Sequence, residues 1–297
     1  MKTKCTYQAT AVALTLLAIG AGCRSNDADD RPVLVVSIEP QKYMLEQIVG
    51  DDFKIVTLMP NGDNPETFEP SMSGRMAVDK ADAYFTTGYF PFESNLNLTA
   101  DNPEIIISTS EGIDLIYGTH AHVDEHHTFL HADSTHQVPD PHVWTSVRNA
   151  RMMSRTMLET VKRINPDKAD TYTGNFNRFD QRLDSLDRSF SQRLDSLDHK
   201  SFLVWHPSLS YFARDYGLEQ IAVGSEGKES SMNSMRRVID DARADSVSVF
   251  FYQRDVDSRQ AEAVNSGVGS RLVPINTSQY DWEDGMILIV DELTAGK

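Results

Sequence analysis

The sequence predicts an α/β protein in which two lobes, each built on a parallel sheet, are joined by one long helix. Three observations predict this fold class. Short β-branched apolar runs alternate with segments of helical period in residues 32–165. The same alternation returns in residues 200–297. Between the two lobes, residues 166–199 carry a single apolar stripe at helical spacing.

The first strand is the clearest element of the two lobes. The apolar run VLVVSI at 33–38 lies between two prolines, which predicts a buried strand. In the N-terminal lobe the predicted strands are 33–38, 53–59, 83–87 and 105–108, and the predicted helices are 41–49, 73–80 and 148–165. In the C-terminal lobe the predicted strands are 202–205, 221–223, 246–252 and 271–275, and the predicted helices are 209–216, 232–244 and 259–265.

The predicted linking helix, 166–199, is the longest element. Its residues 168–198 contain no proline and only one glycine, and QRLDSLD at 181–187 occurs again at 192–198, which keeps the apolar stripe in register. The stripe consists of Phe176, Phe179, Leu183, Leu186, Phe190, Leu194 and Leu197. A coiled-coil dimer is the alternative, but fewer than four clean heptads are present, which favours a helix packed along both lobes.

The N-terminal segment, 1–22, predicts an export signal rather than a part of the fold. Two lysines precede an apolar stretch that is too short to span a bilayer. Small residues precede Cys23, as in a bacterial lipobox, although a glycine replaces the usual leucine three positions earlier. We therefore expect a lipidated Cys23 followed by a polar tether over 23–31, with ordinary signal cleavage as the alternative.

Charge and cysteine content restrict the function. A net charge of −16 argues against nucleic acid as a partner, because phosphate binding requires a basic surface. Removal of residues 1–22 takes away two lysines and one of the two cysteines, which changes the net charge to −18 and leaves only Cys23. A metal in the mature protein would therefore be held by histidine, carboxylate or amide groups.

Residues 118–142 form a histidine-rich segment without helical or strand period. This segment holds seven of the nine histidines, and long loops of this kind are typically functional. Clustered neutral imidazoles would hold zinc loosely and release it as they become protonated at about pH 6. A solvated loop of biased composition is the alternative. Besides His142, its histidines are His120, His122, His126, His127, His131 and His136.

Three further side chains indicate a metal site. Glu66 follows the predicted strand 53–59, His206 directly follows the predicted strand 202–205, and His142 lies at the end of the histidine-rich segment, shortly before the predicted helix 148–165. Open α/β sheets bind ligands at the carboxyl ends of their strands. Imidazole together with carboxylate suits zinc, manganese or iron, and the lack of thiolates disfavours copper(I).

Three longer motifs occur in order across both lobes. They are SIEPQKYMLEQIVGDDFKIVTLMPNGDNPETFEP at 37–70, DPHVWTSVRNA at 140–150 and HPSLSYFARDYGL at 206–218. They resemble the opening segment, the Asp-Pro-His-x-Trp motif and the His-x-x-x-x-Tyr-Phe motif of the zinc and manganese solute-binding lipoproteins of ABC importers (ZnuA type). Together with their surroundings they extend the resemblance over almost the whole of both lobes.

The resemblance implies a rigid linking helix and a metal in the cleft between the lobes. It implies His142 and His206 as ligands, while Glu66 stands where the family has histidine and Asn276 where it has aspartate. The implied metal ligands are therefore Glu66, His142, His206 and Asn276. Gln253 and the six loop histidines are further candidates. An asparagine offers only a carbonyl oxygen, so this departure implies either a preference shifted toward manganese or iron(II), or a paralogue in which metal binding is weakened or lost.

The resemblance also implies the function. We expect a monomeric binding protein, not an enzyme, that captures zinc (or, as alternatives, manganese or iron(II)) and delivers it to an ABC-transporter permease. We expect it outside the cytoplasm, held in the cell envelope by its lipid. A surface adhesin or metal-storage lipoprotein is one alternative. A metallohydrolase is another, since two histidines and a glutamate also describe catalytic zinc, but the chain has no HExxH run.

Overall fold

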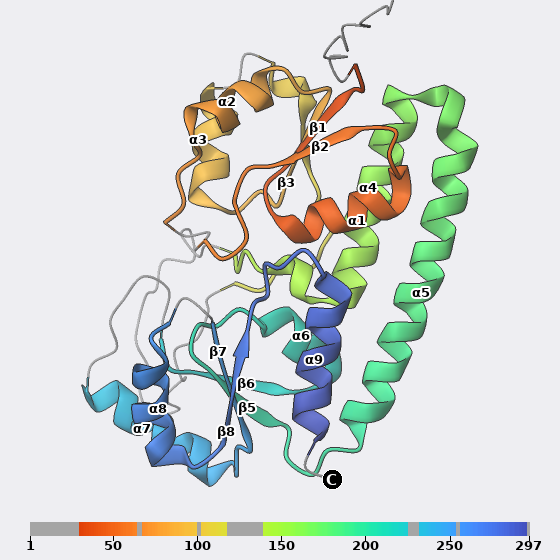
Figure 1. The fold of residues 1–297 in the computed structure, drawn as a ribbon. Helices are drawn as coiled ribbons and strands as arrows, with labels where there is room; N and C mark the ends of the chain where they lie inside the picture. The colour runs from red at the N-terminus through yellow and green to blue at the C-terminus, as the bar shows by residue number, and fades with distance from the viewer. Residues whose placement is uncertain are drawn as a thin grey trace, which may run out of the picture. The chain divides into compact units, whose positions relative to one another are not determined.

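The computed structural model describes residues 30–63, 67–99, 102–117, 139–224, 232–253 and 256–295 (Figure 1). Residues 31–297 form one compact unit. The predicted signal segment, Cys23 and nearly all of the tether lie outside the described residues. Within the described part of the chain, no helix is both long and apolar enough to cross a membrane.

Within these residues, two four-stranded parallel sheets confirm the predicted fold class. The strand orders are β2-β1-β3-β4 and β6-β5-β7-β8, so the order reverses beside β1 in the first sheet and beside β5 in the second. The strands are β1 Val33–Val36, β2 Lys54–Thr57, β3 Ala83–Thr86, β4 Ile106–Ser108, β5 Ser201–Val204, β6 Glu219–Ala222, β7 Val249–Gln253 and β8 Arg271–Ile275. Ligand sites of such sheets lie at these reversals, beyond the carboxyl ends of the strands.

Helices connect and cover the strands (Figure 1). They are α1 Glu39–Val49, α2 Met72–Asp79, α3 Pro91–Thr99, α4 Val147–Ile164, α5 Ala169–Asp195, α6 Ser210–Tyr216, α7 Met232–Ala244, α8 Ser258–Val268 and α9 Trp282–Thr294. Short 3-10 turns occupy η1 Pro103–Ile105, η2 Val143–Thr145 and η3 Pro166–Lys168. Helices α3 and α9 have no counterpart among the helices predicted from the sequence.

Helix α5 is the long helix within the predicted linking segment, and it runs along both lobes (Figure 1). Leu183 and Leu194, which occupy the same position in the two copies of QRLDSLD, are both fully buried. The helix packs against α1 and α4 of the N-terminal lobe and against α6 and α9 of the C-terminal lobe. The apolar stripe is therefore covered by the protein's own lobes, which is the packing that we favoured over a coiled coil.

One hydrophobic core extends through both lobes. The same cluster of buried residues includes Val35 and Phe85 of the first sheet, Phe179 of α5, and Phe202 and Phe251 of the second sheet. A second, smaller cluster lies under α7 and α8. Because packed cores resist deformation, this continuity disfavours wide rotation of one lobe against the other.

A polar contact ties α1, α5 and α9 together at the lobe boundary. Tyr43 of α1 donates its hydroxyl hydrogen to Glu283 of α9 at 2.8 Å. Arg182 of α5 donates to the same carboxylate at 2.9 Å and to Gln47 of α1 at 2.8 Å. Burial, together with the adjacent Glu283 carboxylate, raises the pKa of Tyr43 to about 12, so the phenol remains a donor at neutral pH.

Candidate metal centre

His142 is held in one orientation by the residue two positions before it. It lies directly before η2 and is 2% exposed. Its Nδ1 is 2.8 Å from Asp140 Oδ1, and its backbone N–H donates to the same oxygen at 2.9 Å. An ionised carboxylate can only accept, so the hydrogen of this imidazole resides on Nδ1. The Nε2 lone pair of His142 is therefore available as an acceptor or metal ligand.

The neighbours of Asp140 keep its carboxylate ionised, so that it can accept the hydrogen bond from His142 Nδ1. Burial raises the pKa of Asp140, but the adjacent His142, its hydrogen bonds and the Ser210 hydroxyl outweigh that effect, so the pKa lies below its usual value. The Asp140 carbonyl accepts a hydrogen bond from the hydroxyl of Tyr211 at 2.8 Å. Tyr211 belongs to α6 of the C-terminal lobe, so this lobe positions the segment that carries His142.

His206 follows β5 by two residues, at the point where the order of the second sheet reverses. Its backbone N–H donates to Gln253 Oε1 at 3.2 Å, and its carbonyl accepts from Gln253 Nε2 at the same distance. Gln253 Nε2 also donates to Ser208 at 3.1 Å. Gln253, a candidate ligand in the sequence analysis, thus uses its amide to hold the loop that carries His206.

The two histidines face each other across the lobe boundary. Their Nε2 atoms are 3.3 Å apart, and the ring planes meet at 71°. Two imidazole nitrogens that bind one tetrahedral zinc, each at about 2.0–2.1 Å, are themselves separated by about 3.3–3.4 Å. The separation of the two Nε2 atoms therefore equals the spacing that a shared zinc ion would require.

The remaining candidate ligands are placed differently. Among the described residues, no group of three histidine, cysteine, aspartate or glutamate side chains could hold a metal ion. Glu66 and the loop histidines from His120 to His136 lie outside the described residues. Asn276 directly follows β8, and its amide contacts Asn61 rather than either histidine.

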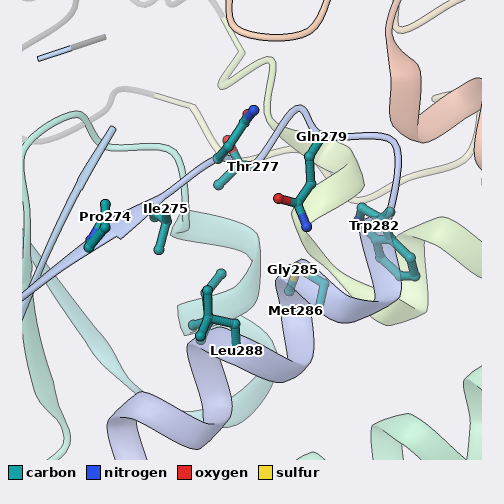
Figure 2. A pocket seen from close by; sticks show the side chains of 10 residues that line it. Pro274, Ile275, Thr277, Gln279, Trp282, Gly285, Met286 and Leu288 are labelled. Atoms are coloured by element: carbon teal, nitrogen blue, oxygen red, sulfur yellow. The ribbon is translucent and has the colours of Figure 1, made fainter. Parts of the chain in front are cut away.

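Trp144 connects the His142 segment to the loop that follows β8, a role that the motif alone did not reveal. The buried indole lies 5.3 Å from the His142 ring, and its Nε1 donates to the Thr277 carbonyl at 2.7 Å. Trp282, at the start of α9, donates from its own Nε1 to the Trp144 carbonyl at 2.9 Å. Figure 2 shows Thr277, Gln279 and Trp282 beside a small cavity, whose lining contains neither metal-site histidine.

Trp144 also packs against Phe90, which lies in a turn organised by the buried carboxyl group of Glu93. Glu93, at the start of α3, accepts from the backbone N–H of Thr87 at 2.7 Å, from that of Phe90 at 3.1 Å and from the Ser37 hydroxyl at 2.5 Å. Burial raises the pKa of Glu93, and these hydrogen bonds oppose the rise. The contacts fix the turn that places the Phe90 ring 5.7 Å from Trp144.

Comparison with known proteins identifies the family of the chain. The family model described as "Zinc-uptake complex component A periplasmic" (ZnuA) matches residues 34–295. The chain is 25% identical to a "Putative metal-binding protein" of Treponema pallidum (strain Nichols), over 95% of this chain and 91% of that protein. It is 25% identical to the "High-affinity zinc uptake system protein ZnuA" of Bacillus subtilis (strain 168), over 89% and 85%. A crystal structure of ZnuA superposes with a TM-score of 0.78 at 28% identity, covering 90% of this chain and 99% of that one.

Proposed function

Because the chain belongs to the ZnuA family of periplasmic zinc-uptake components, we propose that it captures zinc outside the cytoplasm and delivers it to the permease of an ABC importer. The observation that carries this proposal is the 3.3 Å separation of the two Nε2 atoms. It equals the spacing that one zinc ion imposes on two imidazole ligands.

His142 and His206 supply the two nitrogen ligands, and Asp140 keeps the Nε2 lone pair of His142 directed at the ion. Because the hydrogen of His142 resides on Nδ1, its Nε2 accepts and the Nε2–H of His206 donates to it. Zinc binding at His206 Nε2 requires the hydrogen to end up on Nδ1 of the same ring, because a neutral imidazole carries one N–H and binds metal through its other nitrogen. We assign Glu66 as the anionic ligand, on its place in the sequence after β2, since carboxylate with imidazole is a set that zinc accepts.

Delivery requires a place at the membrane. We propose that acylated Cys23 anchors a monomeric chain to the membrane, and that residues 23–31 let the folded unit reach the permease. The acidic chain attracts cations, and the histidines of 118–138 would raise the local concentration of zinc. Manganese and iron(II) are the alternative cargoes to be compared.

Calorimetric titration of residues 31–297 with zinc, manganese and iron(II) tests the proposal. We expect one tight zinc site whose affinity falls by at least about 100-fold in His142→Ala/His206→Ala, because both nitrogen ligands are gone. His199→Ala is the matched control, since His199 is exposed and lies after α5, away from the site. It should bind zinc as the parent does.

The loop histidines require a separate experiment, because they would bind zinc even without the proposed centre. A variant in which the six histidines from His120 to His136 are replaced by asparagine should keep the tight site and lose only weak binding. If zinc binding is weak, involves several sites and survives His142→Ala/His206→Ala, the metal is held by the loop and the proposed centre is wrong.

A further inference from the structure

Asn276 makes a contact that spans the two lobes. It directly follows β8 of the second sheet, whereas Asn61 lies in the turn after β2 of the first sheet. Asn276 Nδ2 donates to Asn61 Oδ1 at 2.6 Å, and the two residues are 215 positions apart in the sequence. The side chains of two strand-end loops are thereby joined directly.

The orientation of the Asn276 amide follows from its second partner. Its Oδ1 accepts from the backbone N–H of Ser278 at 3.0 Å. A backbone N–H can only donate, so the atom that faces it is the oxygen and the NH₂ group faces Asn61. Both ends of the amide are therefore engaged within the protein.

The loop that carries Asn276 is itself fixed to the N-terminal lobe. Trp144 holds the Thr277 carbonyl at 2.7 Å, and the Tyr280 hydroxyl donates to the Glu46 carboxylate of α1. The Tyr280 ring also packs edge-on against Tyr43 of α1 at 5.7 Å. The contact between the asparagines thus forms between a loop already held in place and the turn after β2.

We infer that Asn276 acts as a latch that holds the β2 and β8 loops together without metal, and that it is not a ligand of the captured ion. The term latch denotes the Asn61–Asn276 hydrogen bond. The zinc part of this inference rests on the proposed function, whereas the latch itself does not. A neutral amide oxygen is a weak zinc ligand beside a carboxylate and two imidazoles. The use of the Asn276 amide as a latch therefore leaves one coordination position of the zinc open to water.

The latch is tested on metal-free protein, by thermal unfolding of residues 31–297. Asn61→Ala removes the acceptor and should lower the midpoint by about 2 °C, the shift that one lost hydrogen bond gives in a domain of this size. Asn61→Asp is the matched control, because its carboxylate still accepts from Asn276 Nδ2, and its midpoint should stay within about 1 °C of the parent. In an Asn276→Ala background, Asn61→Ala should have no further effect, since the hydrogen bond is already lost. Equal effects of Asn61→Ala in both backgrounds would overturn the latch.

The role of Asn276 in zinc binding is tested with two substitutions. Asn276→Ala should change the zinc dissociation constant by less than about threefold, whereas loss of a ligand would weaken binding tenfold or more. Asn276→Asp supplies a carboxylate at the open position and should tighten binding at least about tenfold. A tenfold loss in Asn276→Ala would overturn the inference that Asn276 is not a ligand, and no gain in Asn276→Asp would overturn the open coordination position. If the parent binds no zinc at its histidines, the proposed function fails, but the unfolding experiment still decides the latch.

Discussion

Replacement of Trp144 by phenylalanine should remove the hydrogen bond that links the His142 segment to the loop after β8, and so destabilise the fold. The substitution keeps a ring in a fully buried position but removes the donor to the Thr277 carbonyl, now at 2.7 Å. The lost hydrogen bond contributes about 1 kcal/mol, and the carbonyl left without that donor adds about 1 kcal/mol more. The cavity left by trimming the indole adds about another 1 kcal/mol. We therefore expect Trp144→Phe to lower the free energy of unfolding by about 3 kcal/mol.

The measurement is denaturant unfolding of the metal-free chain followed by far-ultraviolet circular dichroism, because the substitution changes the tryptophan fluorescence itself. Trp205→Phe is the matched control, since Trp205 is only partly buried and its ring stacks on Phe250 at 6.4 Å. It should cost less than about 1 kcal/mol. A loss in Trp144→Phe no greater than in Trp205→Phe, at an unchanged denaturant slope, would refute the idea that Trp144 ties these segments together.

Two further predictions concern acid stability and the membrane. The hydrogen bonds from Arg151 hold the pKa of Asp180 below its ordinary value of 3.8. The ionised Asp180 therefore stabilises the fold at a pH above 3.8. This stabilisation is lost as the pH falls through the lower pKa of the folded state. Asp180→Asn should therefore unfold about 1 kcal/mol more easily at pH 7, and the difference from the parent should shrink below about pH 4; a difference that stays constant down to about pH 2 would contradict this. Cys23→Ser should move the full-length protein from the membrane to the soluble fraction of the cells that export it, and persistence in washed membranes would rule out acylation of Cys23 as the anchor.

The elements with strong periodicity were predictable, and those defined by distant partners were not. The apolar runs that became β1 and β5 and the stripe on α5 carry their own signal in the sequence. Helix α3 does not, because its start depends on Glu93 accepting hydrogen bonds from Ser37 and from the turn before it. Helix α9 contains the run MILIV, whose helical form is decided by packing against α5 and β8.

The candidate site shows the same division. Motifs identified His142 and His206, but their 3.3 Å approach joins residues 64 positions apart, and no local pattern encodes it. Gln253 is a candidate ligand by its position in the sequence, and the structure adds that its amide hydrogen-bonds the backbone on both sides of the His206 α-carbon. The contact of Asn276 with Asn61 depends on how the two lobes meet, which the linear sequence does not reveal.

The two proposed nitrogen ligands, His142 and His206, therefore lie at the spacing that one zinc ion would require. One core runs through both sheets, and Arg182 and Tyr43 both bind Glu283 at the boundary, so a wide hinge motion would break many contacts at once. When ligands are held at their final separation, binding requires little reorganisation, and affinity depends on which groups complete the coordination sphere. On the proposed function, we expect selectivity among zinc, manganese and iron(II) to depend on the residues around the two histidines. Among the described residues, Asn276 is the position at which we expect one substitution, Asn276→Asp, to alter this selectivity, because it replaces the amide NH₂ by a carboxylate oxygen.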